Sequence, residues 1–380
     1  MAADPTLDNR AQRLFFVDHL RVALTILVVL HHVAVIYAAN TPFYYLEPAY
    51  QQILALLLLV VFQLLNQAYF MGFFFLISGY FTPASFDRKG LVAFLRDRLL
   101  RLGIPMIAYA FLLGPLASIG ICQMPPELTK ITTPFTWQQY PLLIGVGPLW
   151  FAEMLLIFVF GYAGWRVFTR NRAECAVGKS TGHPFRAIGI FVLALAVASY
   201  LVRIALPLGL AVPVVGFPSL AYLPQYLSFF VLGIIAYRQD WLQRLPGTVG
   251  KWGLGVAAVA TVVLFPVALS GKDAFLGRGT WESGVYALWD SVFSVGVCLG
   301  LITIFRRFFN HPSGLGRFLS RHAFTVYVVH PPVIVLLALA LRGIHLQQLL
   351  KFGLAALLGV PLCFAVAFLV RKIPFASRVV

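Results

Sequence analysis

Long runs of apolar residues recur along this chain of 380 residues and limit what it can fold into. The runs are about 18 to 30 residues long, and a hydrocarbon core about 30 Å thick needs roughly 20 apolar residues per helix. A water-soluble domain could not bury so much apolar surface, since 60% of the residues are hydrophobic and only 11% are charged. We therefore predict an all-α integral membrane protein with a single membrane domain over residues 1–380.

About ten transmembrane helices are expected, and no hydrophilic stretch is long enough to form a separate soluble domain. The expected spans are 14–39, 51–82, 103–121, 142–168, 187–206, 219–237, 252–270, 282–305, 322–341 and 348–370. Between the second and third spans, residues 87–102 (DRKGLVAFLRDRLLRL) place leucines at helical spacing, with arginines on the other side. This pattern predicts an amphipathic helix on the cytoplasmic surface of the membrane.

The net charge of +16 does not indicate a nucleic-acid partner, because the chain has no polar domain to carry a basic stripe. The basic residues instead follow the membrane topology. Of the 29 lysines and arginines, 22 fall in segments that would face one side. These are Arg10, Arg13, Arg88, Lys89, Arg96, Arg98, Arg101, Arg166, Arg170, Arg172, Lys179, Arg186, Arg238, Arg244, Lys251, Arg306, Arg307, Arg317, Arg321, Arg371, Lys372 and Arg378. The positive-inside rule then predicts both termini in the cytoplasm, and a place in the cell (cytoplasmic) membrane.

Ionisable side chains inside a span are costly, and each is a candidate site with a partner. On the first helix, Asp18, Arg21, Thr25 and His32 share one face, and His32 lies roughly 16 Å beyond Arg21 along the helix axis. Asp18 and Arg21 are spaced to pair with each other, whereas His31 points elsewhere. A neutral imidazole can act as a base without the cost of a permanent buried charge, so His32 is a candidate general base.

Other polar groups within the spans have fewer polar neighbours on their own helices. Glu153, Arg203 and His330 stand alone, whereas Asp290 shares a face with Tyr286. For amides and hydroxyls such as Gln63, Asn66 and Ser294, hydrogen bonding between helices is the simpler interpretation. The cysteines fall singly in different segments, so we expect no metal site.

Five motifs in chain order resemble the acyltransferase 3 family of membrane acyltransferases. VDHLRVALTILVVLHH (17–32) carries the family's spacing from Arg21 to His32, and FFFLISGYF (73–81) is similar to its second-span signature. FLRDRLLRLGIP (94–105), GPLWFAEM (147–154) and FTVYVVHPPVI (324–334) are similar to its RxxR, Leu-Trp-Phe and Tyr-x-x-His segments. Glu153 follows Trp150 without the serine that many members have, so the resemblance supports its role less strongly than those of the other motif residues.

The resemblance implies transfer of an acyl group, acetyl or succinyl, from cytoplasmic acyl-coenzyme A to a hydroxyl of a glycan or glycolipid outside the membrane. His32 would deprotonate the hydroxyl or carry the acyl group itself, and Arg21 would order the donor or polarise its thioester, with Asp18 holding Arg21. Arg96, Arg98 and Arg101 would bind the phosphates of the coenzyme, or else serve topology and anionic lipid. The expected substrate-site residues are Trp150, Glu153, Tyr327 and His330.

Two other classes of function remain open at this point. A transporter would use Arg21, His32, Glu153, Asp290 and His330 as a relay, and a scaffold of a glycan-assembly complex would carry a degenerate site. Many members of the family continue into an extracytoplasmic hydrolase-like domain that passes the acyl group on. This chain lacks that domain, so we expect it to acylate its acceptor directly or to use a separate extracytoplasmic transferase.

Overall fold

The computed structural model describes residues 14–47, 52–124, 128, 137–169, 184–210 and 220–379. In these ranges the chain is helical and has no strand, and ten helices are long and apolar enough to cross a membrane. The prediction of an all-α protein with about ten transmembrane helices is confirmed. Several charges behind the predicted orientation lie outside the described residues: Arg10, Arg13, Lys130, Arg170, Arg172 and Lys179.

Nine of the ten spans begin and end within several residues of their predicted positions. Most are single helices, namely α2 (Phe15–Ala38), α3 (Ile53–Lys89), α8 (Trp150–Phe168), α9 (Pro184–Ala205), α10 (Leu223–Arg238), α12 (Gly247–Leu269), α13 (Trp281–Phe308), α14 (Gly314–Ala340) and α15 (Gln348–Arg371). Two short helices, α11 (Trp241–Arg244) and α16 (Ala376–Val379), follow α10 and α15.

The third span begins earlier than predicted. Gly90 has a φ of 74°, and this left-handed residue lets the chain turn sharply between α3 and α4 (Leu91–Arg98). The helix then continues through the π-helical turn Leu99–Gly103 into α5 (Ile104–Ala108). A second π-helical turn, Tyr109–Leu113, leads to α6 (Gly114–Ser118). The predicted amphipathic helix is therefore the first part of the third span, which covers Leu91–Gln123.

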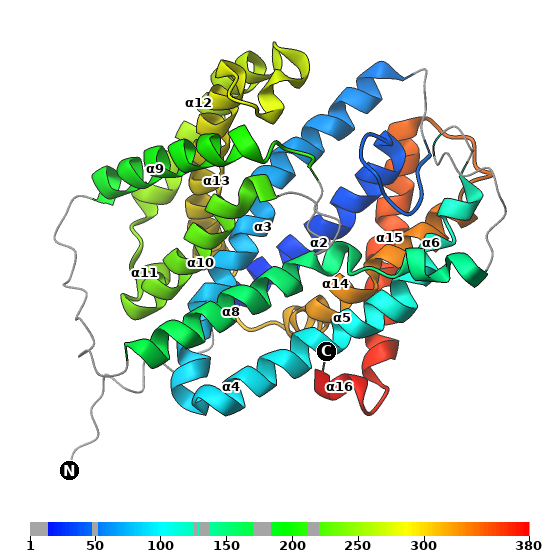
Figure 1. The fold of residues 1–380 in the computed structure, drawn as a ribbon, viewed down its shortest axis with the longest axis horizontal. Helices are drawn as coiled ribbons and strands as arrows, with labels where there is room; N and C mark the ends of the chain where they lie inside the picture. Colours follow the sequence, from blue (N-terminus) through cyan, green and yellow to red (C-terminus); the bar gives the residue numbers. More distant parts are fainter. Residues whose placement is uncertain are drawn as a thin grey trace.

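Figure 1 shows α2 and α3 in the middle of the bundle, with α9, α10, α12 and α13 on one side and α5, α6, α14 and α15 on the other. The contact of α3 with α10 depends on small residues. A Cβ atom added at Gly79 would lie 2.1 Å from the carbonyl oxygen of Phe230, and one at Gly233 would lie 2.1 Å from that of Leu76. Such close backbone approach is typical of helix pairs in membranes.

Candidate active site

A cavity of about 550 Å³ opens between α2, α3, α8, α14 and the π-helical turn Leu99–Gly103, with the segment after α15 on its rim. Its most unusual feature is its charge. Five arginines line it, and none of the lining residues is acidic. They are Arg21, Arg98, Arg101, Arg321 and Arg371. We call this space the arginine cavity. Guanidinium groups bind phosphates bidentately, so the cavity suits a ligand with several phosphate groups.

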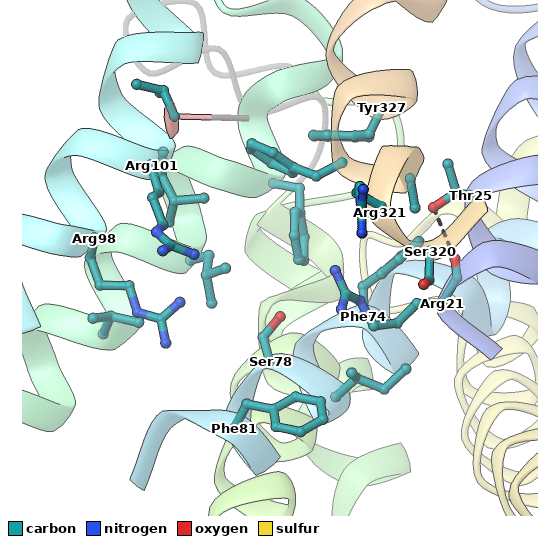
Figure 2. Close-up of a pocket in the computed structure, with 18 of the residues that line it drawn as sticks. Arg21, Thr25, Phe74, Ser78, Phe81, Arg98, Arg101, Ser320, Arg321 and Tyr327 are labelled. Atoms are coloured by element: carbon teal, nitrogen blue, oxygen red, sulfur yellow. Dashed lines mark hydrogen bonds between the residues drawn. The ribbon is translucent and has the colours of Figure 1, made fainter. Parts of the chain in front are cut away.

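Figure 2 shows the arginines on two facing walls of the arginine cavity. Arg98 ends α4 and Arg101 lies in the π-helical turn that follows, so their side chains come from one wall. Arg21 of α2 and Arg321 of α14 come from the other wall. Short π-helical segments are often found at functional sites.

The two arginines of the first wall differ in their partners. Arg101 forms an ion pair with Asp97 at 3.0 Å, and Asp97 also pairs with Lys89 at 2.7 Å. The guanidinium of Arg98 lies over the ring of Phe94, and its buried Nε has no hydrogen-bond partner among the described residues. Arg98 therefore keeps a donor that Asp97 and Lys89 do not occupy. Arg96 is exposed and does not line the cavity, so the structure separates it from the other two predicted phosphate ligands.

On the opposite wall, the predicted pairing of Asp18 with Arg21 is present at 3.8 Å. Thr25, one turn further along α2, donates its hydroxyl to the carbonyl oxygen of Arg21 at 2.9 Å and lines the cavity. Aromatic side chains also line the cavity, among them Phe74, Phe151 and Tyr327. The cavity thus combines cationic and apolar surfaces.

Beyond Tyr327 lie two histidines from different helices. The ring of His32 is 4.9 Å from the ring of His330, measured between centroids, and the ring of Tyr327 is 6.1 Å from that of His330. The helices α2 and α14 are in contact, and this contact brings the two histidines together. His330 was expected to stand alone, and this expectation was wrong.

The hydrogen bonds of the two histidines define which nitrogen is free. Nδ1 of His32 lies 2.9 Å from the carbonyl oxygen of Val28, and Nδ1 of His330 lies 2.8 Å from that of Tyr327. A carbonyl oxygen only accepts, so Nδ1 must carry the proton in each ring. In the neutral ring, Nε2 then holds the lone pair of a base. Nε2 of His330 is buried without a partner.

His31 also belongs to this group. Its ring lies 5.4 Å from that of His32 and 5.1 Å from that of Phe70 on α3, so it faces a different helix, as expected. Phe43, in the loop after α2, covers His32 with a ring distance of 5.1 Å. Nothing in the sequence around Phe43 indicated this contact.

Of the four predicted substrate-site residues, only Tyr327 lines the arginine cavity, and the predicted base His32 does not line it either. Trp150 packs against Tyr226 of α10 with a ring distance of 5.5 Å, and Glu153 has a buried Oε2 without a partner. Neither residue lines the cavity. The segment that precedes Trp150 is nevertheless tied to the site, because the hydroxyl of Tyr327 donates to the carbonyl oxygen of Pro148. The Leu-Trp-Phe and Tyr-x-x-His motifs therefore meet at Tyr327.

Sequence reasoning missed Arg321 and Arg371 as residues of the site. Both were counted only toward topology, since neither lies in a motif that the resemblance covers. The signal that could have found Arg321 is its position two turns before Tyr327, on the helix that carries His330.

A second polar cluster lies within the bundle, away from the arginine cavity. Arg203 of α9 and Asp290 of α13 form a fully buried ion pair at 2.6 Å. The guanidinium of Arg203 also lies over the rings of Tyr222 and Tyr286, at 5.0 and 5.4 Å from their centroids. Arg203 therefore does not stand alone, and Asp290 is engaged with it. None of these four residues lines the arginine cavity.

Comparison with known proteins shows the family to which the chain belongs. A family model described as an acyltransferase domain matches residues 14–371. The chain belongs to the acyltransferase 3 family. It is similar to the glucans biosynthesis protein C of Escherichia coli O81 (strain ED1a), with 25% identity over 337 residues, or 85% of this chain and 82% of that protein. The protein of the same name from Escherichia coli K12 has the same identity and coverage. No solved structure matches the chain.

Family membership and the ten apolar helices together make this chain a multi-pass membrane protein of an acyl-transferring family. The family model covers α2 and α14, which carry His32 and His330. It also covers all five arginines of the arginine cavity. The segment after Arg371, which contributes Ser377 and Val379 to the lining of the cavity, lies beyond the matched residues.

Proposed function

We propose that this protein transfers an acyl group from acyl-coenzyme A in the cytoplasm to a hydroxyl group of a glycan on the other side of the cell membrane. The observation that supports this most is the continuity of the site. Five arginines line the cavity together with Phe74, Phe151 and Tyr327, and the ring of Tyr327 lies 6.1 Å from that of His330, which is next to His32. A phosphate-rich head, a thin arm and a reactive thioester would meet the arginines, the aromatic side chains and the histidines in turn.

The transfer needs one base and no metal. Nε2 of His32 takes the proton of the acceptor hydroxyl as the oxygen attacks the thioester carbonyl. A carbon–oxygen bond forms, the carbon–sulfur bond breaks, and the proton passes from His32 to the thiolate of the released coenzyme. In a variant of this scheme, Nε2 of His32 attacks the thioester carbonyl and the coenzyme leaves as its thiolate. The hydroxyl then attacks the acyl-histidine, the carbon–nitrogen bond breaks, and the hydroxyl proton passes to the thiolate. Nε2 of His330, beside His32, is a second group able to accept the proton.

The acceptor and the acyl group belong to the proposal as well. The similarity to proteins named for glucan biosynthesis supports a glucan or a related glycan or glycolipid as the acceptor. We propose acetyl or succinyl as the acyl group. The acceptor is acylated directly or through a separate extracytoplasmic transferase. The lipid-facing surface is rich in exposed leucine, valine and phenylalanine, and contacts membrane lipids rather than nucleic acid.

In this arrangement, the bilayer separates the donor in the cytoplasm from the acceptor on the other side. Arg21 and His32 stand on the same helix, roughly 16 Å apart along its axis. A donor that enters at the arginines can therefore present its thioester deep in the bundle without crossing the membrane. The transporter alternative loses support, because Asp290 is paired with Arg203 away from the histidines.

Incubation of the purified protein with radiolabelled acyl-coenzyme A and a glucan tests the proposal. The wild-type protein should release free coenzyme A and label the glucan, and the well-folded His32→Ala variant should do neither. His345→Ala is the control, because His345 is exposed in the loop between α14 and α15 and does not line the arginine cavity. Normal acyl transfer by the His32→Ala variant would exclude His32 as the base. Flux of the substrate across proteoliposomes without cleavage of the thioester would favour a transporter.

A further inference from the structure

The two walls of the arginine cavity carry arginines that face each other, and this arrangement allows a finer assignment that rests on the proposed function. Arg98 and Arg101 form one wall, and Arg21 and Arg321 form the other (Figure 2). Coenzyme A also carries its phosphates in two separate groups. The pyrophosphate adjoins the pantetheine arm, and the 3′-phosphate stands on the ribose at the other side of the nucleotide.

The separations along α2 and α14 indicate which wall suits which phosphate group of the coenzyme. Arg21 precedes His32 by eleven residues on α2, and Arg321 precedes His330 by nine residues on α14. At about 1.5 Å per residue these separations are roughly 16 and 13 Å. The pantetheine arm contains about a dozen bonds between the pyrophosphate and the sulfur, which is roughly 15 Å when the arm is extended like a peptide chain. Arg21 and His32 share a face of α2, whereas Arg321 and His330 lie on opposite faces of α14. A pyrophosphate held at Arg21, with Arg321 beside it, would therefore bring the thioester to the level of the histidines.

We propose that Arg21 and Arg321 bind the pyrophosphate of the acyl donor, while Arg98 and Arg101 bind its 3′-phosphate. Arg321 is then a donor-binding residue, and Arg98 and Arg101 select for the phosphorylated ribose. The assignment also changes the role expected for Arg21. Its side chain is far shorter than its separation from His32, so it anchors the donor instead of polarising the thioester carbonyl.

The wall formed by Arg98 and Arg101 suits a terminal phosphate. Asp97 pairs with both Arg101 and Lys89, and its pair with Arg101 orients that guanidinium. Arg98, three residues earlier, has a buried Nε that lacks a partner among the described residues. A phosphate monoester carries up to two negative charges and three exposed oxygens, and it can accept from both guanidinium groups at once. The phosphate of an anionic lipid offers similar chemistry, so the experiment must separate the two sources.

The test measures the dissociation constants of coenzyme A and of 3′-dephospho-coenzyme A for the full chain in phosphatidylcholine nanodiscs. The wild-type protein should prefer coenzyme A by about tenfold to a hundredfold, the range expected for charge-assisted hydrogen bonds to one phosphate. Arg98→Gln and Arg101→Gln should weaken binding of coenzyme A only, so the preference falls toward one. Arg321→Gln should weaken binding of both ligands equally and keep the preference. Arg96→Gln, an exposed position on α4, should change neither.

The outcomes separate failure of this assignment from failure of the proposed function. A wild-type protein that binds neither ligand would overturn the acyl-coenzyme A function itself. If coenzyme A binds but Arg98→Gln keeps the full preference, the assignment of the walls is overturned, and altered retention of phosphatidylglycerol by that variant would identify lipid as the ligand of Arg98. Arg98→Lys guards against misfolding, because it keeps the charge but loses the bidentate geometry, and it should also lower the preference.

Discussion

At the scale of single residues, the structure gives different surroundings to the two ring nitrogens of His330. Its Nδ1 donates to the carbonyl oxygen of Tyr327, and its buried Nε2 has no partner. The amide nitrogen of asparagine can replace Nδ1, and that of glutamine can replace Nε2. The two substitutions therefore separate the role of one ring nitrogen from that of the other.

We expect His330→Asn to fold normally and to lower kcat by roughly a hundredfold to a thousandfold, within the range typical of a lost acid–base group. His330→Gln should lose the hydrogen bond to Tyr327 and show a lower Tm. Steady-state acyl transfer and thermal unfolding of both variants check this. Normal kcat in His330→Asn would leave His330 a purely structural residue.

The buried ion pair of Arg203 and Asp290 gives a second prediction at this scale. Removing one partner of such a pair leaves a buried charge uncompensated, which costs about 3–5 kcal/mol. Asp290→Asn and Arg203→Met should each lower the Tm markedly, whereas the double variant Arg203→Met/Asp290→Leu should recover most of the loss. Thermal unfolding in detergent measures this.

The same double variant separates a structural role of the pair from a functional one. None of these residues lines the arginine cavity, so a folded double variant should keep acyl transfer within a few fold of the wild type. A folded double variant without transfer activity would place Arg203 and Asp290 in the reaction and revive the relay expected of a transporter.

At the scale of elements, the loop that follows α2 folds back over the histidines. Phe43 packs against His32, and the hydroxyl of Tyr109 donates to that of Tyr44 at 3.0 Å. Glu47 fixes the end of the loop by an ion pair with Lys351 of α15. Burial and the nearby Glu47 carboxylate raise the pKa of Tyr45 to about 12, so its phenol stays protonated and can donate to Glu47 at neutral pH.

This loop should protect the thioester from water on the side of the acceptor. Phe43→Ala opens a path to His32, so we expect hydrolysis of acyl-coenzyme A without acceptor to rise several-fold, while transfer to the glycan falls. Phe43→Leu keeps an apolar cover and serves as the control. Release of free coenzyme A, with and without acceptor, measures both reactions. Unchanged hydrolysis in Phe43→Ala would show that other residues exclude water.

The elements also show what could be predicted from the sequence. The ten spans were predictable because each crossing of the bilayer needs a long apolar helix. The start of the third span was not, since the leucine and arginine pattern of 91–102 fits a helix on the membrane surface as well as the first turns of a span. The pattern of residues 91–102 defines an apolar face of the helix. It does not show whether lipid or another helix covers that face.

The site was predictable only where its residues share a helix. Asp18, Arg21 and His32 follow from helical spacing, and the resemblance adds Arg98, Arg101 and His330. The contact of His32 with His330 joins residues 298 positions apart, and it depends on how α2 packs against α14. Arg321 and Arg371 could not be distinguished from the many arginines that follow the positive-inside rule.

At the scale of the whole molecule, the positions of the helix ends show at which end of the bundle the arginine cavity lies. The arginine cavity lies toward the end of the bundle where α3 and α15 end and α14 begins, and basic residues such as Lys89, Arg317 and Lys372 gather at these helix ends. Cys122 lies at the other end of the third span and is exposed, whereas Cys298 and Cys363 are buried. The predicted orientation places the arginines in the cytoplasm and Cys122 outside.

Sealed membrane vesicles test this direction, because coenzyme A carries several negative charges and does not cross a bilayer. Inside-out vesicles expose the cytoplasmic face, so they should bind and consume added acyl-coenzyme A, whereas right-side-out vesicles should do so only after permeabilisation. In a Cys175→Ser background, which leaves Cys122 as the exposed thiol of the described residues, an impermeant maleimide should label right-side-out vesicles only. Labelling from the cytoplasmic face, together with donor use by right-side-out vesicles, would reverse the orientation and place the arginine cavity outside, where no acyl-coenzyme A is available.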